Sequence, residues 1–285
     1  MKVYCYIILL ATGLLAALGC EKGPGSAPEQ TGRTPISFEV ESVPETKAFT
    51  ATTASNLTSF YVTALKSDNS EFFKNVNFTG TSGGSFTGGW YWPASGALSF
   101  YAVSKSYTQT LSAGNITVSG NAASDGDVVR AAKTSVSNGT SSMALAFGHI
   151  YAALQGITFT AASGYTVTVT ALSYQLKTTG TYNIATDAWS SVGALGGATA
   201  VASPSLSNTG IAALCVPATG NCKVTVTYTC ARLGYSETYT RTSTVTLAKG
   251  YRNTVTGTLG PNPGVLDLDV TISPWTGLAE SLVEM

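Results

Sequence analysis

Apolar and polar residues alternate with a period of two along most of the chain after Pro35. The alternation is clearest in residues 36–41, 167–170, 224–229 and 266–270. Successive side chains of a β-strand point to opposite faces, so each segment predicts a strand with one buried and one solvated face. The 42 threonines, 30 glycines and ten prolines among the 285 residues favour short strands joined by turns. The sequence therefore predicts an all-β protein.

The charge composition excludes one large class of function. Lys and Arg number 15, Asp and Glu also number 15, and charged residues make up 11% of the chain. A nucleic-acid-binding protein needs a surplus of basic residues to displace counterions from phosphates, so we expect no nucleic-acid partner. Hydrophobic residues make up 44% of the chain, which is enough to build a packed core.

The N-terminus has the pattern of an export signal. Lys2 precedes an apolar segment at residues 7–18, which is too short for a stable transmembrane helix. The segment ends at Cys20 in a sequence that resembles a bacterial lipobox, which implies cleavage after residue 19 and lipid attachment to Cys20. The alternative is an ordinary signal peptide followed by an unmodified cysteine. Residues 20–34 are rich in Gly, Pro and polar residues and predict a flexible tether.

Turn signals separate the predicted strands at intervals of about 8 to 12 residues, which is typical of antiparallel sandwiches. Small residues near 161–164 interrupt two strand-like segments. We therefore expect two tandem antiparallel β-sandwich domains, at residues 35–162 and 163–285. Residues 190–210 predict a long loop inside the second domain, and only residues 128–154 have a composition that allows a helical turn or two.

The chain offers few groups for catalysis or metal binding. His149 is the only histidine and lies in an apolar segment, which favours a packing role over that of a general base. Asp267 and Asp269 lie on one face of a predicted strand and are expected to be solvated. Residues 125–127 hold two carboxylates but lack the rest of a calcium loop, so a plain turn is expected. We predict no enzyme activity, no metal and no cofactor.

The cysteines near the C-terminal end suggest one cross-link. Cys215 and Cys222 flank a predicted hairpin turn, which would place them opposite each other and allow a disulfide in an oxidising compartment. The alternative is a pair of free thiols. Cys230 is eight residues beyond Cys222 on the same predicted strand, about 26 Å away, so we expect a buried free thiol.

Trp90, Tyr91 and Trp92 form the most conspicuous aromatic cluster of the sequence. Neighbouring residues of a strand point to opposite faces, so at least one ring is expected outside unless the segment is irregular. An exposed Trp90 or Trp92 would suit stacking on a sugar ring. The alternative is that the rings fill the core and the rim of the first sandwich.

Short segments along the whole chain follow one another in an order typical of a known family. They are residues 36–43, 46–48, 57–64, 90–93, 98–102, 146–149, 180–182, Trp189, Gly250, Tyr251 and residues 272–275. Their order resembles the fimbrillin family of Bacteroidetes. The resemblance implies two transthyretin-like sandwich domains and a role as a structural subunit of cell-surface fimbriae that supports adhesion. It also implies polymerisation with other subunits and an outer-membrane, cell-surface location reached through the lipid on Cys20.

The resemblance also implies that a protease removes the first predicted strand during maturation of the subunit. A protease of trypsin-like specificity is expected to cut between Lys47 and Ala48, with Arg33 as the alternative site. A cut after Lys47 would remove residues 35–47 and leave a groove for an extended segment of the next subunit. Residues 276–285 are the candidate donor, and a capping tail is the alternative. The removable strand would take with it the apolar side chains of Ile36, Phe38 and Val40.

A second function of a different class stays open at this point. The chain would be a monomeric surface lipoprotein that binds glycans or another host or bacterial surface ligand through the Trp90 to Trp92 region. Dependence of ligand binding on those rings, without polymers, would favour this second function.

Overall fold

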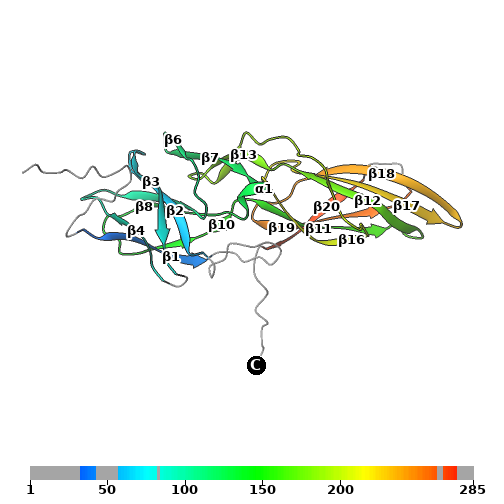
Figure 1. Ribbon diagram of the computed structural model, residues 1–285, viewed down its shortest axis with the longest axis horizontal. Coiled ribbons are helices and arrows are strands. Elements are labelled where there is room, and N and C mark those ends of the chain that lie inside the picture. The colour runs from blue at the N-terminus through cyan, green and yellow to red at the C-terminus, as the bar shows by residue number, and fades with distance from the viewer. Residues whose placement is uncertain (1–32, 43–56, 82–83, 262–265, 275–285) are drawn as a thin grey trace, which may run out of the picture.

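The computed structural model describes residues 33–42, 57–81, 84–261 and 266–274, and over these residues the protein is almost entirely β. The prediction of an all-β fold is confirmed. The molecule is elongated, with an N-terminal lobe at one end and a C-terminal lobe at the other (Figure 1). Among the described residues, no helix is long and apolar enough to cross a membrane.

The N-terminal lobe is built on one eight-stranded sheet. Its strands lie in the order β10, β8, β5, β2, β3, β4, β1, β9, so β1, the first described strand, is next to one edge. All neighbouring pairs are antiparallel except β1 and β9, which are parallel. The strands are β1 (Pro35–Ser42), β2 (Ser59–Lys66), β3 (Glu71–Thr79), β4 (Phe86–Tyr91), β5 (Leu98–Val103), β8 (Val129–Val136), β9 (Met143–Ala146) and β10 (Gly148–His149).

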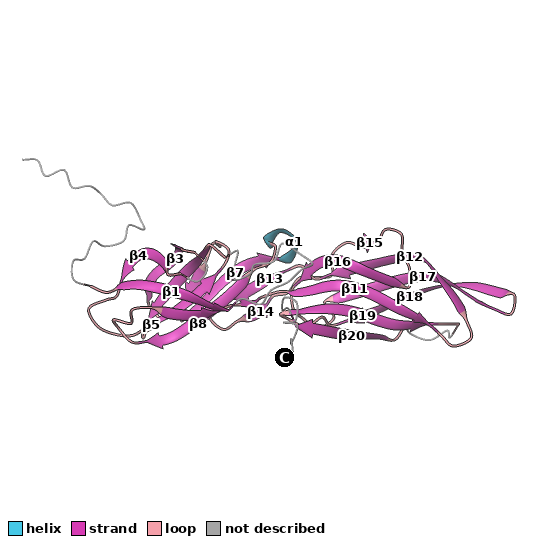
Figure 2. Cartoon of the chain, turned by 90° about the horizontal axis from the view of Figure 1, so that it is seen from below, coloured by secondary structure: helices cyan, strands magenta, loops and turns pink. Residues whose placement is uncertain are grey.

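The C-terminal lobe is a sandwich of two four-stranded sheets, whose strands run along the long axis of the molecule in Figure 2. One sheet has the order β16, β11, β19, β20, and the other has the order β15, β12, β17, β18. Within the first, β11 and β19 are parallel. The strands are β11 (Ala152–Ala161), β12 (Thr166–Leu176), β15 (Thr199–Ala200), β16 (Ser207–Cys215), β17 (Cys222–Arg232), β18 (Tyr235–Val245), β19 (Tyr251–Leu259) and β20 (Leu268–Pro274).

A smaller sheet lies between the lobes and combines strands from both halves of the chain. Its order is β14, β13, β7, β6. The only described helix, α1 (Ala122–Asp125), follows β7, and the Asn121 side chain caps it by accepting a hydrogen bond from the Ala123 N–H at 3.1 Å. The strands are β6 (Thr110–Ser112), β7 (Asn115–Asn121), β13 (Thr179–Asn183) and β14 (Ala188–Ser190).

Three groups of buried side chains correspond to these three parts. The N-terminal core is rich in Phe, whereas the C-terminal core consists mainly of aliphatic residues with three cysteines. A third group, the junction core, draws on β2, β7, β11, β13 and β16 and therefore joins the lobes. Strand β17 shows the predicted alternation most clearly, because buried and half-buried residues alternate from Cys222 to Ala231.

Strand pairing changes two expectations from the sequence. Strand β11 precedes residue 162 but pairs with β16 and β19, so the sheets divide the chain before Ala152 and not after residue 162. Small residues at 161–164 mark a turn inside the second lobe instead. Most of residues 128–154 form strands, and α1, the only helix among the described residues, lies just before them. The alanines of residues 128–154 are compatible with either helix or strand, and pairing with neighbouring strands gives most of this segment an extended conformation.

Candidate assembly site

Strand β1 lies between β4 and β9 and is their only connection in the sheet. It pairs antiparallel with β4, where Phe38 faces Phe86, and parallel with β9, where Phe38 faces Met143. Because β4 and β9 are not neighbours, the backbone groups that they direct toward β1 depend on this strand for their hydrogen bonds. Its removal would leave two sheet edges facing each other.

The side chains of β1 reach the centre of the N-terminal core. Ile36 is 1% exposed and Phe38 is fully buried, whereas Val40 is half-buried. The Phe38 ring packs edge-on against the rings of Phe60, Phe78 and Phe100, with centroid distances of 5.9, 5.0 and 5.3 Å. Alternation of apolar and polar residues places these groups on one face of the strand. The expected inward face of the strand is therefore the observed one.

Hydrogen bonds also hold the flanks of β1. The Trp92 N–H donates to the Thr34 carbonyl at 3.0 Å, and the Ser37 hydroxyl donates to the Ser141 carbonyl at 2.6 Å. These contacts join β1 to the segments that precede β5 and β9. They fix the register in which Ile36 and Phe38 enter the core.

Several predicted site residues lie outside the described residues. These are Cys20, the Lys47–Ala48 pair and residues 276–285. Arg33, the alternative cleavage residue, is described and exposed, two residues before β1 begins.

Of the two tryptophans expected as a sugar-stacking surface, Trp92 is buried and Trp90 is half-buried. Trp92 is 1% exposed, and its indole N–H donates to the Thr140 carbonyl at 2.8 Å. Trp90 is half-buried and packs against Phe72 and Phe73 at centroid distances of 5.8 and 4.9 Å. Core packing, the alternative stated from the sequence, is the arrangement found for Trp92.

The cysteine pair also differs from its expected geometry. Cys215 ends β16 and Cys222 begins β17, but these strands belong to the two opposite sheets of the sandwich and do not form a hairpin. Both are free, buried thiols, as is Cys230. Burial raises the pKa of Cys222 to about 12 and raises the pKa of Cys215 further. The free state of Cys230 matches the prediction.

Asp125 anchors the first of three polar networks near the junction of the lobes. Its carboxylate accepts hydrogen bonds from Lys105 Nζ at 2.8 Å, Tyr107 Oη at 2.8 Å and Tyr151 Oη at 2.6 Å. Burial opposes ionisation, but the hydrogen bonds outweigh it and hold the pKa of Asp125 below its usual value. Burial also raises the pKa of both tyrosines, so they stay protonated donors. Asp125 therefore ties α1 to the N-terminal lobe and to the start of β11.

Asp127 and His149 form the second network. The Nδ1 atom of His149 lies 2.7 Å from Asp127 Oδ1, and both side chains are 1% exposed. Their burial fits the packing role expected for His149.

The two carboxylates of residues 125–127 do not converge on one site. Asp125 and Asp127 contact different partners. Among the described residues, no cluster of three or more His, Cys, Asp or Glu suits a metal ion.

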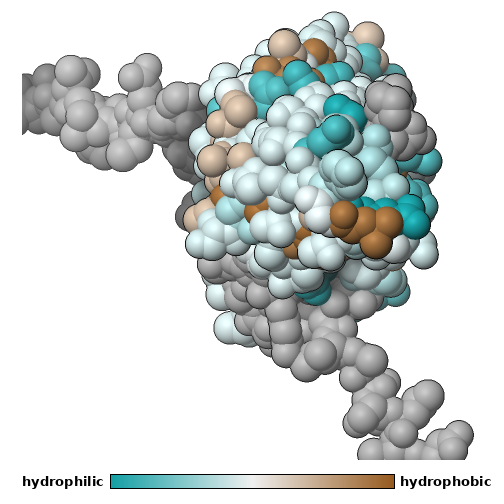
Figure 3. All heavy atoms as spheres, turned by 90° about the vertical axis from the view of Figure 1, so that its right-hand side faces the viewer, coloured by the Kyte–Doolittle hydropathy of each residue, from teal (hydrophilic) through white to brown (hydrophobic). Residues whose placement is uncertain are grey.

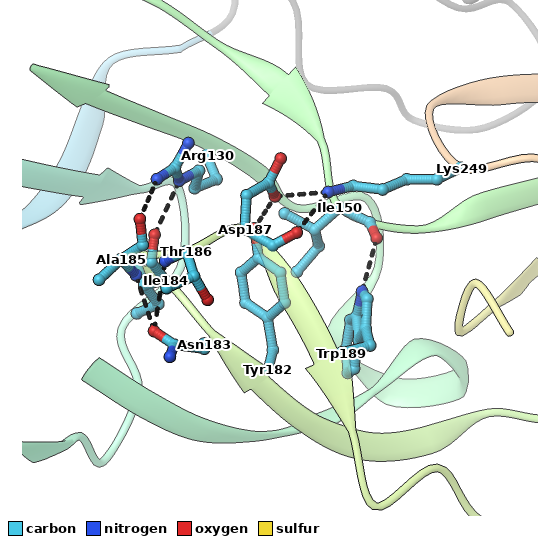
Figure 4. Close-up of polar contacts among 10 residues, drawn as sticks. All are labelled: Arg130, Ile150, Tyr182, Asn183, Ile184, Ala185, Thr186, Asp187, Trp189 and Lys249. Atoms are coloured by element: carbon cyan, nitrogen blue, oxygen red, sulfur yellow. Dashed lines mark hydrogen bonds and ion pairs between the residues drawn. The ribbon is translucent and has the colours of Figure 1, made fainter. Parts of the chain in front are cut away.

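The third network centres on Asp187, in the turn between β13 and β14 (Figure 4). Asp187 accepts a hydrogen bond from the Tyr182 hydroxyl and pairs with Lys249 Nζ at 2.5 Å. Burial opposes ionisation here too, but these two donors hold the pKa of Asp187 below its usual value. Lys249 lies between β18 and β19, so the pair joins the middle sheet to the C-terminal lobe.

Arg130 continues this network into the N-terminal lobe. Its guanidinium, on β8, donates to the carbonyls of Ile184 and Ala185 at 2.8 and 2.9 Å (Figure 4). The Trp189 indole donates to the Ile150 carbonyl at 2.9 Å and packs over Gly120, where a Cβ would approach the ring to 2.5 Å. The lobes are therefore joined by polar contacts, ring packing and shared strands. The sequence did not predict these contacts between the lobes.

Comparison with known proteins adds independent information. The model of the fimbrillin-like family matches residues 46–275. A fimbrial protein from Bacteroides vulgatus has a similar structure, with a TM-score of 0.55 and 16% identity over 85% of this chain and 99% of the other. A candidate cell adhesion protein from Bacteroides uniformis gives a TM-score of 0.53 and 18% identity over 87% and 100%. No curated protein matches the chain.

Proposed function

The chain belongs to the fimbrillin-like family, and we propose that it is a structural fimbrial subunit that polymerises by exchange of its first strand. Family membership supports the coarser role of a fimbrial subunit or adhesion protein at the cell surface. The finer proposal includes export as a lipoprotein, lipid attachment at Cys20, proteolytic maturation at the outer membrane and a donor strand from another subunit.

The position of β1 is the observation that supports strand exchange. The strand fills a slot with β4 on one side and β9 on the other, and its side chains complete the Phe-rich core. It is also the first described strand of the chain, so a single cut after it frees it without unthreading any other element. A strand in the middle of the chain would need two cuts.

An empty slot should be less stable than a filled one. Burial of a large apolar side chain contributes about 1.5 to 3 kcal/mol, so Ile36 and Phe38 together contribute about 3 to 6 kcal/mol. The unpaired backbone groups of β4 and β9 would add a further cost. A donor segment that restores both the apolar burial and the backbone hydrogen bonds gains this free energy, less the cost of ordering the donor.

A cut between Lys47 and Ala48 would release β1, whereas a cut at Arg33 would leave it attached. We therefore take Lys47 as the maturation site and a protease of trypsin-like specificity as the partner. The donor in this proposal is residues 276–285 of another subunit. In an extended conformation, Ala279, Ser281, Val283 and Met285 would share one face of that segment. These side chains would replace those of β1 in the slot.

N-terminal sequencing of the surface-exposed protein tests this function. The expected first residue is Ala48, in protein that runs as a denaturant-resistant ladder. Lys47→Ala should keep the chain unprocessed and monomeric, whereas Arg33→Ala, the matched control, should mature normally. Ladders assembled from chains that still carry β1 would overturn the proposal.

A further inference from the structure

We propose that β18 pairs with β18 of a second copy of this chain, antiparallel and about a two-fold axis at Tyr239. The pairing would join the β15–β12–β17–β18 sheets of the two copies into one continuous sheet. It goes beyond strand exchange and does not depend on it, since it involves neither β1 nor residues 276–285.

Strand β18 is the longest edge strand of the described sheets. It has eleven residues and pairs with β17 along its whole length without a register shift, and no described strand pairs with its other side. The other edges are less regular: five of the edge strands have two to four residues, the pairing of β16 is interrupted by a register shift, and β20 ends in Pro274. Short strands, bulges and prolines are features that keep an edge from pairing with another chain. Strand β18 has none of these three features.

The only charged residues of β18 lie symmetrically about its central tyrosine. Glu237 precedes Tyr239 by two residues and Arg241 follows it by two, so the three side chains share one face of the strand. The Tyr239 hydroxyl donates to Glu237 Oε2 at 2.5 Å, and the Arg241 guanidinium carbon lies 4.9 Å from the centroid of the Tyr239 ring. These contacts arrange a negative group, an aromatic ring and a positive group in one row.

An antiparallel second copy reverses this row, which makes the edge complementary to itself. When Tyr239 lies opposite Tyr239 of the second copy, Glu237 lies opposite Arg241 of that copy and Arg241 lies opposite its Glu237. Pairs of opposite charge and pairs of aromatic rings across neighbouring strands both stabilise a sheet. A shift of two residues in either direction loses both ion pairs, and a shift of one residue turns the side chains to opposite faces. Charge therefore selects both the partner and the register.

The other face of β18 carries hydroxyl groups that fit the same register. Thr225 and Thr227 of β17 face threonines of β18, and the hydroxyl oxygens of the two pairs are 2.9 and 3.0 Å apart. In the proposed pairing, Thr238 lies opposite Thr240 of the second copy and Thr240 lies opposite its Thr238. Pairs of threonines across strands are favourable in a sheet. The hydroxyl pairs found between β17 and β18 would thus continue across the dimer.

The character of the surface agrees with pairing through the backbone and charges. The view onto the end of the C-terminal lobe shows a mostly hydrophilic surface with separate hydrophobic spots (Figure 3). Tyr235, at the start of β18, is 82% exposed, and the pairing would place it opposite Ser243 of the second copy. A contact about a two-fold axis is closed, because each copy uses the same edge. The uncut chain should therefore form dimers and no longer species.

Charge reversal tests the partner and the register together. Glu237→Arg and Arg241→Glu each place like charges opposite each other at two positions, so either variant alone should dimerise at least about tenfold more weakly than the wild type. A mixture of the two variants restores both pairs of opposite charge in a heterodimer, and the double variant restores them in a homodimer. Glu71→Arg, which reverses an exposed charge on β3, is the matched control and should dimerise like the wild type.

Sedimentation velocity of the full, unprocessed chain over a range of concentrations measures these associations. We expect dimers of the wild type and the control, loss of dimers in each single variant, and their recovery in the mixture and the double variant. Because a folding defect would not be repaired by mixing, recovery identifies the contact itself. A monomeric wild type, single variants that dimerise as well as the wild type, or a mixture without dimers would overturn this pairing and leave strand exchange untouched.

Discussion

The two lobes bury their apolar residues in different ways. The N-terminal core is built around Phe rings and is completed by β1, a strand from the beginning of the described chain. The C-terminal core is mainly aliphatic and is enclosed by two sheets whose strands all come from residues 152–274. The N-terminal lobe therefore depends on β1, a terminal strand that lies inside its sheet, whereas the terminal strand of the C-terminal lobe, β20, lies at the edge of its sheet. In our proposal, this difference assigns strand exchange to the N-terminal lobe.

The largest effect is expected at Phe38. Phe38→Ala removes a fully buried ring that contacts three others, and should lower the free energy of unfolding of the N-terminal lobe by about 3 to 5 kcal/mol. Hydrogen exchange should speed up in β2 and β3 but stay slow in β17. Ile36→Val, at a neighbouring buried position, should cost only about 0.5 to 1.5 kcal/mol. Equal acceleration in both lobes would show that the cores do not behave separately.

A smaller effect is expected at the junction that links the lobes. Asp125→Asn keeps an acceptor for the tyrosines but loses the ion pair with Lys105, so it should cost about 1 to 3 kcal/mol. Chemical denaturation with probes in each lobe would measure this loss. Asp269→Asn, an exposed carboxylate on β20, is the control and should change stability by less than about 0.5 kcal/mol.

Acid should weaken the same junction. The folded-state pKa values of Asp125 and Asp187 lie below the unfolded value of 3.8, so their stabilisation is complete above that value and is lost as the pH falls through the folded values. The midpoint of thermal unfolding should therefore fall more steeply below about pH 4 in the wild type than in Asp125→Asn. Parallel curves for the two proteins would exclude a contribution from Asp125.

The smallest effect is expected at the thiols of the C-terminal core. Cys215 and Cys222 are buried, and their raised pKa values keep them protonated and unreactive. Cleavage after Lys47 should leave their rate of alkylation unchanged at pH 8, because it opens only the N-terminal core. Faster alkylation after cleavage would show that release of β1 also loosens the second lobe.

The sequence predicted the strands well because their signal is local. Alternation in segments such as 224–229 depends only on which face of a strand is buried, and β17 has that pattern. The inward face of β1 was predicted for the same reason. The hairpin expected between Cys215 and Cys222 was wrong, because a turn signal does not tell whether the next strand pairs with the last or crosses to the opposite sheet.

The junction could not be predicted in this way. Asp187 and Lys249 are 62 residues apart, and Arg130 and Ala185 are 55 apart. No spacing in the sequence marks such pairs, because the sheet order that brings them together is set by packing of the whole chain. The domain boundary was misplaced for a related reason, since β11 has a strand pattern but its partner residues lie 49 to 99 positions later in the chain.

Amide hydrogen exchange of β4 and β9, followed through cleavage and assembly, tests the central claim most directly. We predict slow exchange in the uncut chain, fast exchange in the cleaved monomer that has lost β1, and slow exchange again in the polymer. The recovery should require residues 276–285 of a neighbouring subunit. Slow exchange throughout, with β1 retained in the polymer, would contradict the account.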